Sequence, residues 1–156
     1  MSLGDDMKSC FFIGHREASS EVFSALTEAI EQHIVEYCVT KFIVGNYGGF
    51  DHMAAKAVIA AKERHPDISL SMLIPYHPAE RAMEPPKGFD NTFYPPGMEK
   101  VPRRLAIVRA NRYMVDHVDY LIAYAWHPAS NAQNLVEYGR KREQRNLIAV
   151  TVLPKR

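Results

Sequence analysis

The chain has 156 residues, 47% of them hydrophobic and 24% charged, with a formal net charge of +1. These values are typical of one soluble domain, so we expect a single domain over residues 1–156. A net charge this close to zero argues against a nucleic-acid partner. The polar residues 1–7 are expected to be flexible and are no signal peptide, and no apolar run is long enough to cross a bilayer. A cytoplasmic protein without a membrane partner is expected.

Short apolar runs alternate with helical periodicities along the whole chain. Continuous apolar runs, which are typical of buried parallel strands, predict strands at 10–13, 41–44, 69–74, 118–124 and 147–153. Apolar positions at helical spacing predict helices at about 20–37, 51–64, 103–116 and 134–144. Ser19 or Ser20 is the expected cap of the first helix.

Residues 75–102 interrupt this alternation and contain seven prolines. A loop of this length inside a compact domain is usually functional or partly disordered. Its aromatic residues favour packing over full disorder. A lid over the ligand site and a surface decoration are equally open interpretations.

The alternation predicts an α/β fold. It is a three-layer, Rossmann-like, doubly wound parallel sheet of about five strands, with the order 3-2-1-4-5. In such a sheet ligands bind beyond the carboxyl ends of the strands, where the strand order reverses. That switch point lies between the first and fourth predicted strands. Three loops are expected to meet there.

The first of these loops follows the first strand and contains Gly14, His15 and Arg16. The arginine is a candidate for two parallel hydrogen bonds to a phosphate, and pairing with a nearby acid is the alternative. The histidine is a candidate general acid, general base or phosphate contact. A histidine ring satisfied by the backbone is equally plausible.

The second loop is the turn after the second strand. Its candidate ligand-binding residues are Gly45, Asn46, Gly48, Gly49 and Asp51. Glycines permit a close approach of the backbone, and the free N–H groups of the helix that follows favour an anion. Asp51 either caps that helix or accepts a hydroxyl group of a ribose. A carboxylate disfavours a phosphate directly above it, which moves the expected phosphate toward another loop.

The third loop, after the fourth strand, contributes Ser130, Asn131 and Asn134 as hydrogen-bonding candidates. Glu137 follows one turn into the next helix and is the candidate catalytic carboxylate, because it can stabilise positive charge on a sugar. A capping-box role after Asn134 is the alternative. The third helix carries a polar face that is either a ligand contact or an exposed charged surface, formed by Arg109, Asn111, Arg112 and Asp116.

No metal ligands and no cofactor are expected. The seven histidines are scattered without the spacing of metal ligands, and neither a CxxC nor an HExxH motif occurs. Cys10 and Cys38 lie in apolar runs and are expected to be buried, reduced thiols.

Four segments together resemble the SLOG superfamily, which is named for the Smf/DprA DNA-processing proteins and the Lonely Guy (LOG) enzymes. They are FFIGHR at 11–16, FIVGNYGGFD at 42–51, RANRYMVD at 109–116 and NLVEY at 134–138. Within the superfamily the chain is most similar to the YpsA-like branch. The resemblance implies a Rossmann-like fold, a small nucleotide or nucleotide-derived ligand, and a homo-oligomer.

The LOG branch implies a sharper hypothesis. LOG enzymes cleave the N-glycosidic bond of nucleoside monophosphates and carry a PGGxGTxxE motif, whose end aligns with Asn134 and Glu137. Residues 127–133 contain no glycine, which departs from that motif. We therefore rank a nucleotide-binding sensor or regulatory module first and a phosphoribohydrolase-like N-glycosidase second. A DprA-like protein associated with single-stranded DNA comes third.

Overall fold

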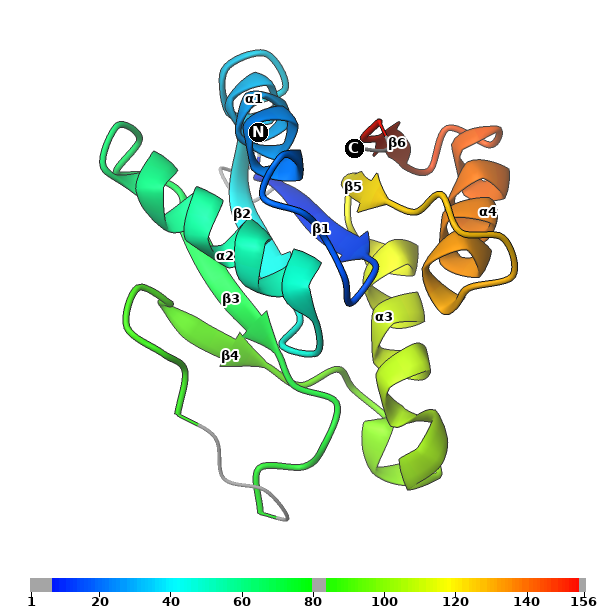
Figure 1. Ribbon diagram of the computed structural model, residues 1–156. Helices are drawn as coiled ribbons and strands as arrows, with labels where there is room; N and C mark the ends of the chain where they lie inside the picture. Colours follow the sequence, from blue (N-terminus) through cyan, green and yellow to red (C-terminus); the bar gives the residue numbers. More distant parts are fainter. Residues whose placement is uncertain (1–6, 80–83, 155–156) are drawn as a thin grey trace.

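The computed structural model describes residues 7–79 and 84–154 and contains one six-stranded sheet (Figure 1). The strand order is β4-β3-β2-β1-β5-β6, and all neighbouring strands are parallel. The strands are β1 (Lys8–Gly14), β2 (Val39–Val44), β3 (Ser69–Leu73), β4 (Asn91–Phe93), β5 (Tyr120–Tyr124) and β6 (Ala149–Val152). The order reverses between β1 and β5, so the switch point lies beyond the carboxyl ends of these two strands.

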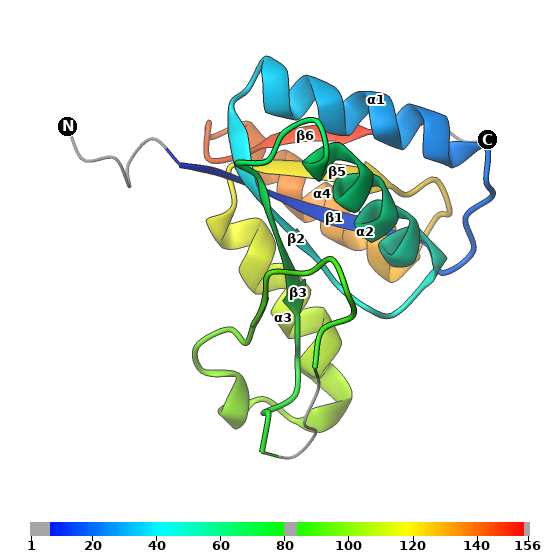
Figure 2. The ribbon, with the colours of Figure 1, turned by 90° about the vertical axis from the view of Figure 1, so that its left-hand side faces the viewer.

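Helices cover both faces of this sheet (Figures 1 and 2). Helices α1 (Val22–Val35) and α2 (Gly49–Lys62) pack on one face, and α3 (Ala106–His117) and α4 (Asn131–Glu143) pack on the other. Successive side chains of β1 serve the two layers alternately, because Phe12 packs with α1 and α2 while Phe11 packs with α3 and α4. Both faces are therefore buried, as the continuous apolar runs predict.

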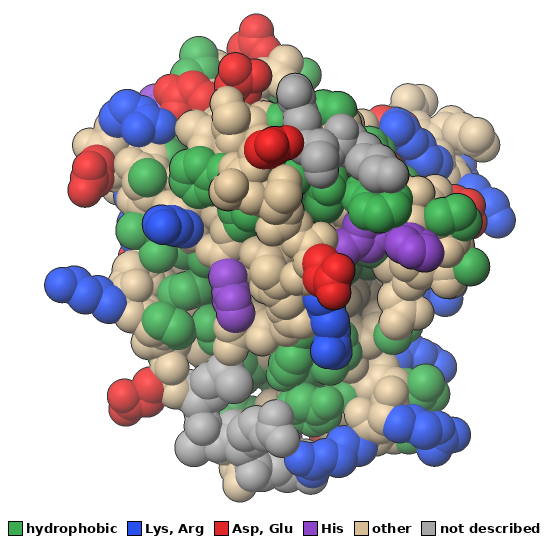
Figure 3. Space-filling view, viewed as in Figure 1, with side chains coloured by type: hydrophobic (Ala, Val, Ile, Leu, Met, Phe, Trp, Pro, Cys, Tyr) green, Lys and Arg blue, Asp and Glu red, His purple; other side chains and the backbone are tan. Residues whose placement is uncertain are grey.

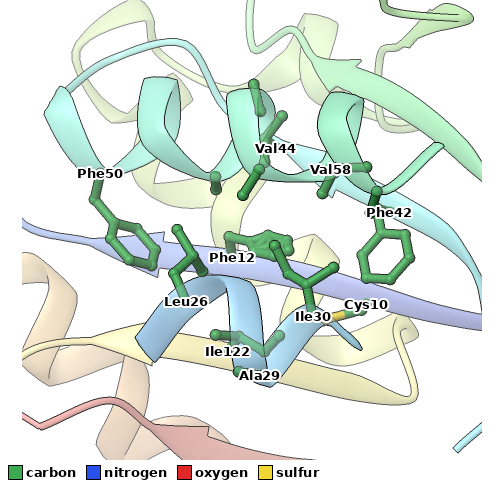
Figure 4. Close-up of a cluster of buried hydrophobic side chains, with 14 of the residues drawn as sticks. Cys10, Phe12, Leu26, Ala29, Ile30, Phe42, Val44, Phe50, Val58 and Ile122 are labelled. Carbon is green, nitrogen blue, oxygen red and sulfur yellow. The ribbon is translucent and has the colours of Figure 1, made fainter. Parts of the chain in front are cut away.

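The larger core cluster lies between the sheet and the helices α1 and α2. Phe12 and Phe42 stack there with ring centroids 5.9 Å apart, and Leu26 and Ile30 of α1 close over them (Figure 4). Phe50 reaches the same core from the first turn of α2 and is fully buried. The core therefore holds the start of α2 against the carboxyl end of β1, where the site is expected.

The five predicted strands pair in the predicted order, and β4 adds a sixth strand at the edge beyond β3. This strand lies inside the proline-rich segment, and its three residues are too few to show the apolar pattern from which strands are predicted. Part of that segment packs against the domain: Met98 of the short helix η2 (Met98–Lys100) is buried, and η3 (Arg103–Leu105) leads into α3. Residues 80–83 of this segment, for which a lid and a surface decoration were both open, lie outside the described residues, as do residues 1–6 of the predicted flexible terminus.

The starts of α1 and α2 differ from those predicted, because backbone contacts rather than the expected side chains cap these helices. Helix α1 begins after Glu21, and neither Ser19 nor Ser20 provides a side-chain cap. The cap of α2 is Gly48, so Asp51 lies within the first turn instead of preceding it. Cys38 is exposed, contrary to expectation, while Cys10 is buried. Within the described residues no helix is both long and apolar enough to span a bilayer.

Candidate functional site

His15 joins the loops that follow β1 and β5. Its Nε2 atom accepts hydrogen bonds from the backbone N–H groups of Trp126 at 3.0 Å and of His127 at 3.2 Å. Its ring also makes edge contacts with Tyr124, Trp126 and His127. In Figure 3 two histidine side chains lie together on this part of the surface. The structure thus brings the first and third predicted loops together and satisfies this histidine with backbone donors.

These two hydrogen bonds determine the protonation state of His15. A ring nitrogen that accepts hydrogen bonds carries no proton, so the neutral ring carries its proton on Nδ1. Burial, and secondly the charge of His127, lower the pKa of His15 below its ordinary value of 6.5. The ring is therefore neutral at physiological pH and holds the loop after β5 in place.

Gly48 and Gly49 of the second loop lie so close to the backbone of Arg16 that a side chain at either position would collide with it. A Cβ atom on Gly48 would lie 2.8 Å from the Cα atom of Arg16, and one on Gly49 would lie 2.6 Å from the carbonyl oxygen of Arg16. That oxygen accepts the N–H of Gly49 at 2.7 Å, and the carbonyl of His15 accepts the N–H of Phe50 at 3.4 Å. The first amides of α2 are thus capped by the loop after β1, while the Arg16 side chain is exposed.

Gly14 is required by close packing at the end of β1. A Cβ atom at this position would lie 2.4 Å from ring atoms of Phe50. The first and second loops are therefore locked together by two contacts, one through Phe50 and the other through Arg16. These glycines build the frame of the site.

Asp51 is largely buried beside the turn that precedes α2. Its Oδ2 atom accepts the N–H of Tyr47 at 3.0 Å, and a Cβ atom on Gly45 would lie 3.0 Å from the same oxygen. Burial raises the pKa of Asp51, while the hydrogen bond from Tyr47 and the nearby His52 act to lower it. On the exposed side of the turn, Asn46 Oδ1 lies 3.1 Å from His52 Nε2.

In the third loop, Ser130 is the N-cap of α4. Its Oγ atom accepts the N–H of Gln133 at 3.1 Å and donates to the carbonyl of His127 at 2.8 Å, so this hydroxyl is engaged within the loop. Helix α4 consequently begins at Asn131, three residues before the predicted start at Asn134, and Glu137 is not a capping-box residue. Ala129 adopts φ 60°, a left-handed conformation usually taken by glycine.

A pocket of about 170 Å³ opens between α3 and α4 beside the end of β1; we call it the α3–α4 pocket. It is lined by Ile13, Val108, Asn111, Arg112, Asn131, Asn134, Leu135 and Tyr138. Part of its lining is apolar, and three amides and a guanidinium at its rim supply the polar groups. The guanidinium of Arg112 lies 4.3 Å from the ring centroid of Tyr138, and the Tyr138 hydroxyl donates to Asp116.

A smaller cavity of about 20 Å³, the Asp51 cavity, adjoins the second loop. It is lined by Gly45, Tyr47, Asp51, Leu73, Pro75, Ile107, Ala110 and Asn111. Figure 1 shows the loop between β2 and α2 beside the N-terminal part of α3, which supplies the last three of these residues. Asn111 lines both this cavity and the α3–α4 pocket.

Two predicted residues lie apart from these hollows. Glu137 is exposed on α4 and lines neither the α3–α4 pocket nor the Asp51 cavity. Arg109 lines another surface hollow on α3, which shares Arg112 with the α3–α4 pocket. Among the described residues no group of three or more His, Cys, Asp or Glu side chains is arranged to hold a metal ion.

The polar face predicted for the third helix includes Asn111 and Arg112, which line the α3–α4 pocket, whereas Tyr138 was not among the predicted residues. On α4, Tyr138 follows Asn131 and Asn134 at helical spacing, which places all three on one face. This spacing could have identified Tyr138 from the sequence. Nothing in the sequence indicated which face of α3 meets α4, so the part played by Asn111 required the packed structure.

The comparisons with known proteins identify the fold. No protein-family model and no curated protein sequence matches the chain. Among solved structures it is similar to DNA processing protein A from Helicobacter pylori, with a TM-score of 0.63 at 15% identity, over 97% of this chain and 67% of that chain. The two proteins share a Rossmann-like α/β fold, and membership of the SLOG superfamily remains a prediction. The YpsA-like branch remains a prediction.

The argument from net charge against a nucleic-acid partner must be corrected. DNA processing protein A, which is similar in fold, binds single-stranded DNA. The net charge of +1 also conceals an uneven distribution, because residues 100–115 contain five basic and no acidic residues. Lys and Arg side chains gather at the lower right of the face in Figure 3. A net charge near zero therefore does not describe the surface next to the pocket.

Proposed function

We propose that this chain binds a nucleotide, either free or as a unit of a single-stranded nucleic acid, with its base in the α3–α4 pocket. The observation that carries the proposal is the set of three amides at the rim, from Asn111, Asn131 and Asn134. None of these side chains forms a hydrogen bond with another group of residues 7–79 or 84–154. Each amide offers both donors and an acceptor, which is what the edge of a base requires.

The rest of the pocket supports the same class of ligand. Its apolar lining residues, Ile13, Val108 and Leu135, suit the face of an aromatic ring. Pockets that enclose a whole drug-sized ligand measure roughly 300–1,000 Å³, so 170 Å³ suits one ring system with the remainder outside. Arg112 lies at the rim, where a guanidinium can meet a phosphate.

The basic segment 100–115 favours including the single-stranded form among the ligands. Positive side chains beside a base pocket attract a phosphate backbone in a salt-dependent manner. The fold likeness to a protein that binds single-stranded DNA adds to this expectation. Binding rather than turnover is proposed, because the candidate catalytic Glu137 is exposed outside both hollows.

The proposal is tested by titrating the protein with the common ribonucleoside and deoxyribonucleoside monophosphates and with single-stranded oligonucleotides. Ligand at 100 times its Kd should stabilise the fold by about 2.7 kcal/mol. Asn111→Ala and Asn134→Ala should each weaken binding about tenfold, since each removes a hydrogen bond to the ligand. Gln32→Ala, an exposed amide on α1 on the opposite face of the sheet, is the matched control. No saturable binding to any nucleotide or oligonucleotide would refute the proposal.

A further inference from the structure

Asp51 has acceptor capacity that the protein does not use. Its Oδ2 atom accepts the N–H of Tyr47, and Oδ1 accepts no hydrogen bond from residues 7–79 or 84–154. An ionised carboxylate has about four acceptor positions. Because burial raises the pKa of Asp51, a further hydrogen-bond donor would stabilise its charged form.

The Asp51 cavity limits that donor to a small neutral group. Its volume of about 20 Å³ is room for one water molecule or one hydroxyl group. The walls next to the carboxylate are largely apolar, from Leu73, Pro75, Ile107 and Ala110. An ammonium group would leave two of its three donors facing these walls. A phosphate would face a carboxylate and would not fit.

The cavity is also close enough to the proposed base pocket to take part of the same ligand. Asn111 lines both hollows, so one side chain separates them. In a nucleotide, the group attached directly to the base is a sugar with hydroxyl groups. A base in the α3–α4 pocket can therefore direct its sugar past Asn111 toward Asp51.

We propose that the Asp51 cavity is a subsite for one sugar hydroxyl of the ligand, with Asp51 as its acceptor and Asn111 beside it. This inference rests on the proposed function and assigns the specificity of the same site. The hydroxyl donates to the Asp51 carboxylate and takes the place of a water molecule. Asp51 then distinguishes ligands by their sugar, while the amides at the rim hold the base.

The test compares sugars on one base. The nucleoside monophosphate that binds most tightly is titrated calorimetrically alongside its 2′-deoxy, 3′-deoxy and 2′,3′-dideoxy counterparts. A hydrogen bond to a charged acceptor predicts that loss of the relevant hydroxyl weakens binding about tenfold or more. Affinities of all four compounds within about twofold of each other would overturn the subsite and leave the proposed function intact. If no nucleotide binds at all, the proposed function itself fails, and the subsite fails with it.

A substitution then assigns the discrimination to Asp51. In Asp51→Asn the ratio of affinities for the hydroxylated and dideoxy compounds should fall several-fold, with little change for the dideoxy compound. Asp67→Asn, at an exposed position, is the matched control and should keep the wild-type ratio. An unchanged ratio in folded Asp51→Asn would overturn the role of the carboxylate. The wild-type comparison alone decides the subsite if the variant does not fold.

Discussion

His15 Nε2 accepts the backbone N–H of Trp126 at 3.0 Å across the switch point of the sheet. This hydrogen bond joins the loop after β1 to the loop that leads into α4. Because α4 supplies Asn131 and Asn134 to the α3–α4 pocket, the neutral state of one imidazole supports one wall of the proposed site. The loop can keep this position only while Nε2 remains unprotonated.

The stability of the fold should therefore decrease in mild acid. Burial holds the pKa of His15 below 6.5, so between that folded value and 6.5 the unfolded chain binds more protons than the folded chain. The free energy of unfolding then rises with pH through this window and levels off above it. Denaturation at several pH values between about 5 and 8 measures the slope. In His15→Phe, whose side chain cannot accept these hydrogen bonds or bind a proton, the slope of the free energy of unfolding against pH should be smaller.

His33 must be separated from this effect. It is fully buried in α1, and burial lowers its pKa in the same direction, against the opposing hydrogen bond to the carbonyl of Ala29. Nitrogen-15 NMR resolves the two histidines. His15 should show a proton on Nδ1 at neutral pH and should titrate below 6.5. A proton on Nε2 of His15, or titration at its ordinary pKa, would contradict the proposed state of the loop.

Asp51→Asn should stabilise the protein at neutral pH. Burial raises the pKa of Asp51 above its ordinary value of 3.8. As the pH rises from 3.8 through the raised pKa of the folded protein, the folded state therefore loses stability relative to the unfolded state. An amide avoids the buried charge and still offers an oxygen to the Tyr47 N–H. The midpoint of thermal unfolding should rise above that of wild type near neutrality, and the difference should vanish in acid. A lower midpoint at neutral pH would mean that the carboxylate is a structural requirement.

Gly49→Ala should be strongly destabilising. The added Cβ atom would lie 2.6 Å from the Arg16 carbonyl oxygen, a backbone atom that cannot rotate away. Overpacking of this kind costs typically about 1–3 kcal/mol. Urea denaturation measures the cost.

Gly139→Ala in α4 is the matched control. Its nearest neighbours are side-chain methyl groups of Leu121 and Val150, at 3.3 and 3.4 Å. Alanine is favoured over glycine in a helix by roughly 1 kcal/mol, which offsets this mild crowding. Equal losses in the two variants would show that the contact with Arg16 is not what requires glycine at position 49.

The sequence predicted the strand order because short apolar runs alternate with amphipathic helices, a pattern that few topologies satisfy. It did not predict β4, since the residues Asn91–Phe93 have no apolar alternation and pair with β3 only through tertiary packing. The start of α2 was also missed. The carbonyl groups that cap it belong to His15 and Arg16, more than thirty residues earlier in the chain.

The sequence predicted which loops meet at the switch point, but not the contacts that their residues make there. Glycines before a helix suggested an anion cradle, yet Gly48 and Gly49 face the backbone of Arg16. Close approach of backbone to ligand and of backbone to backbone require the same residue, so sequence alone does not separate them. The pocket itself depends on how α3 packs against α4, which no local pattern encodes.

Ala129→Gly should stabilise the loop before α4. Ala129 has φ 60°, and a left-handed conformation costs an L-residue with a Cβ atom roughly 1–2 kcal/mol. Glycine removes that cost but adds roughly 0.5–1 kcal/mol of conformational entropy to be lost on folding. The free energy of unfolding should therefore increase by up to about 1 kcal/mol, as measured by urea denaturation.

Ala132→Gly provides the contrast, because Ala132 is buried in the first turn of α4 with ordinary helical backbone. There glycine relieves no strain and should cost roughly 1 kcal/mol through helix propensity, with a further loss from the missing methyl group. Opposite signs for the two substitutions would establish that residue 129 holds a glycine-like conformation without being glycine. Destabilisation of similar size in both variants would contradict it.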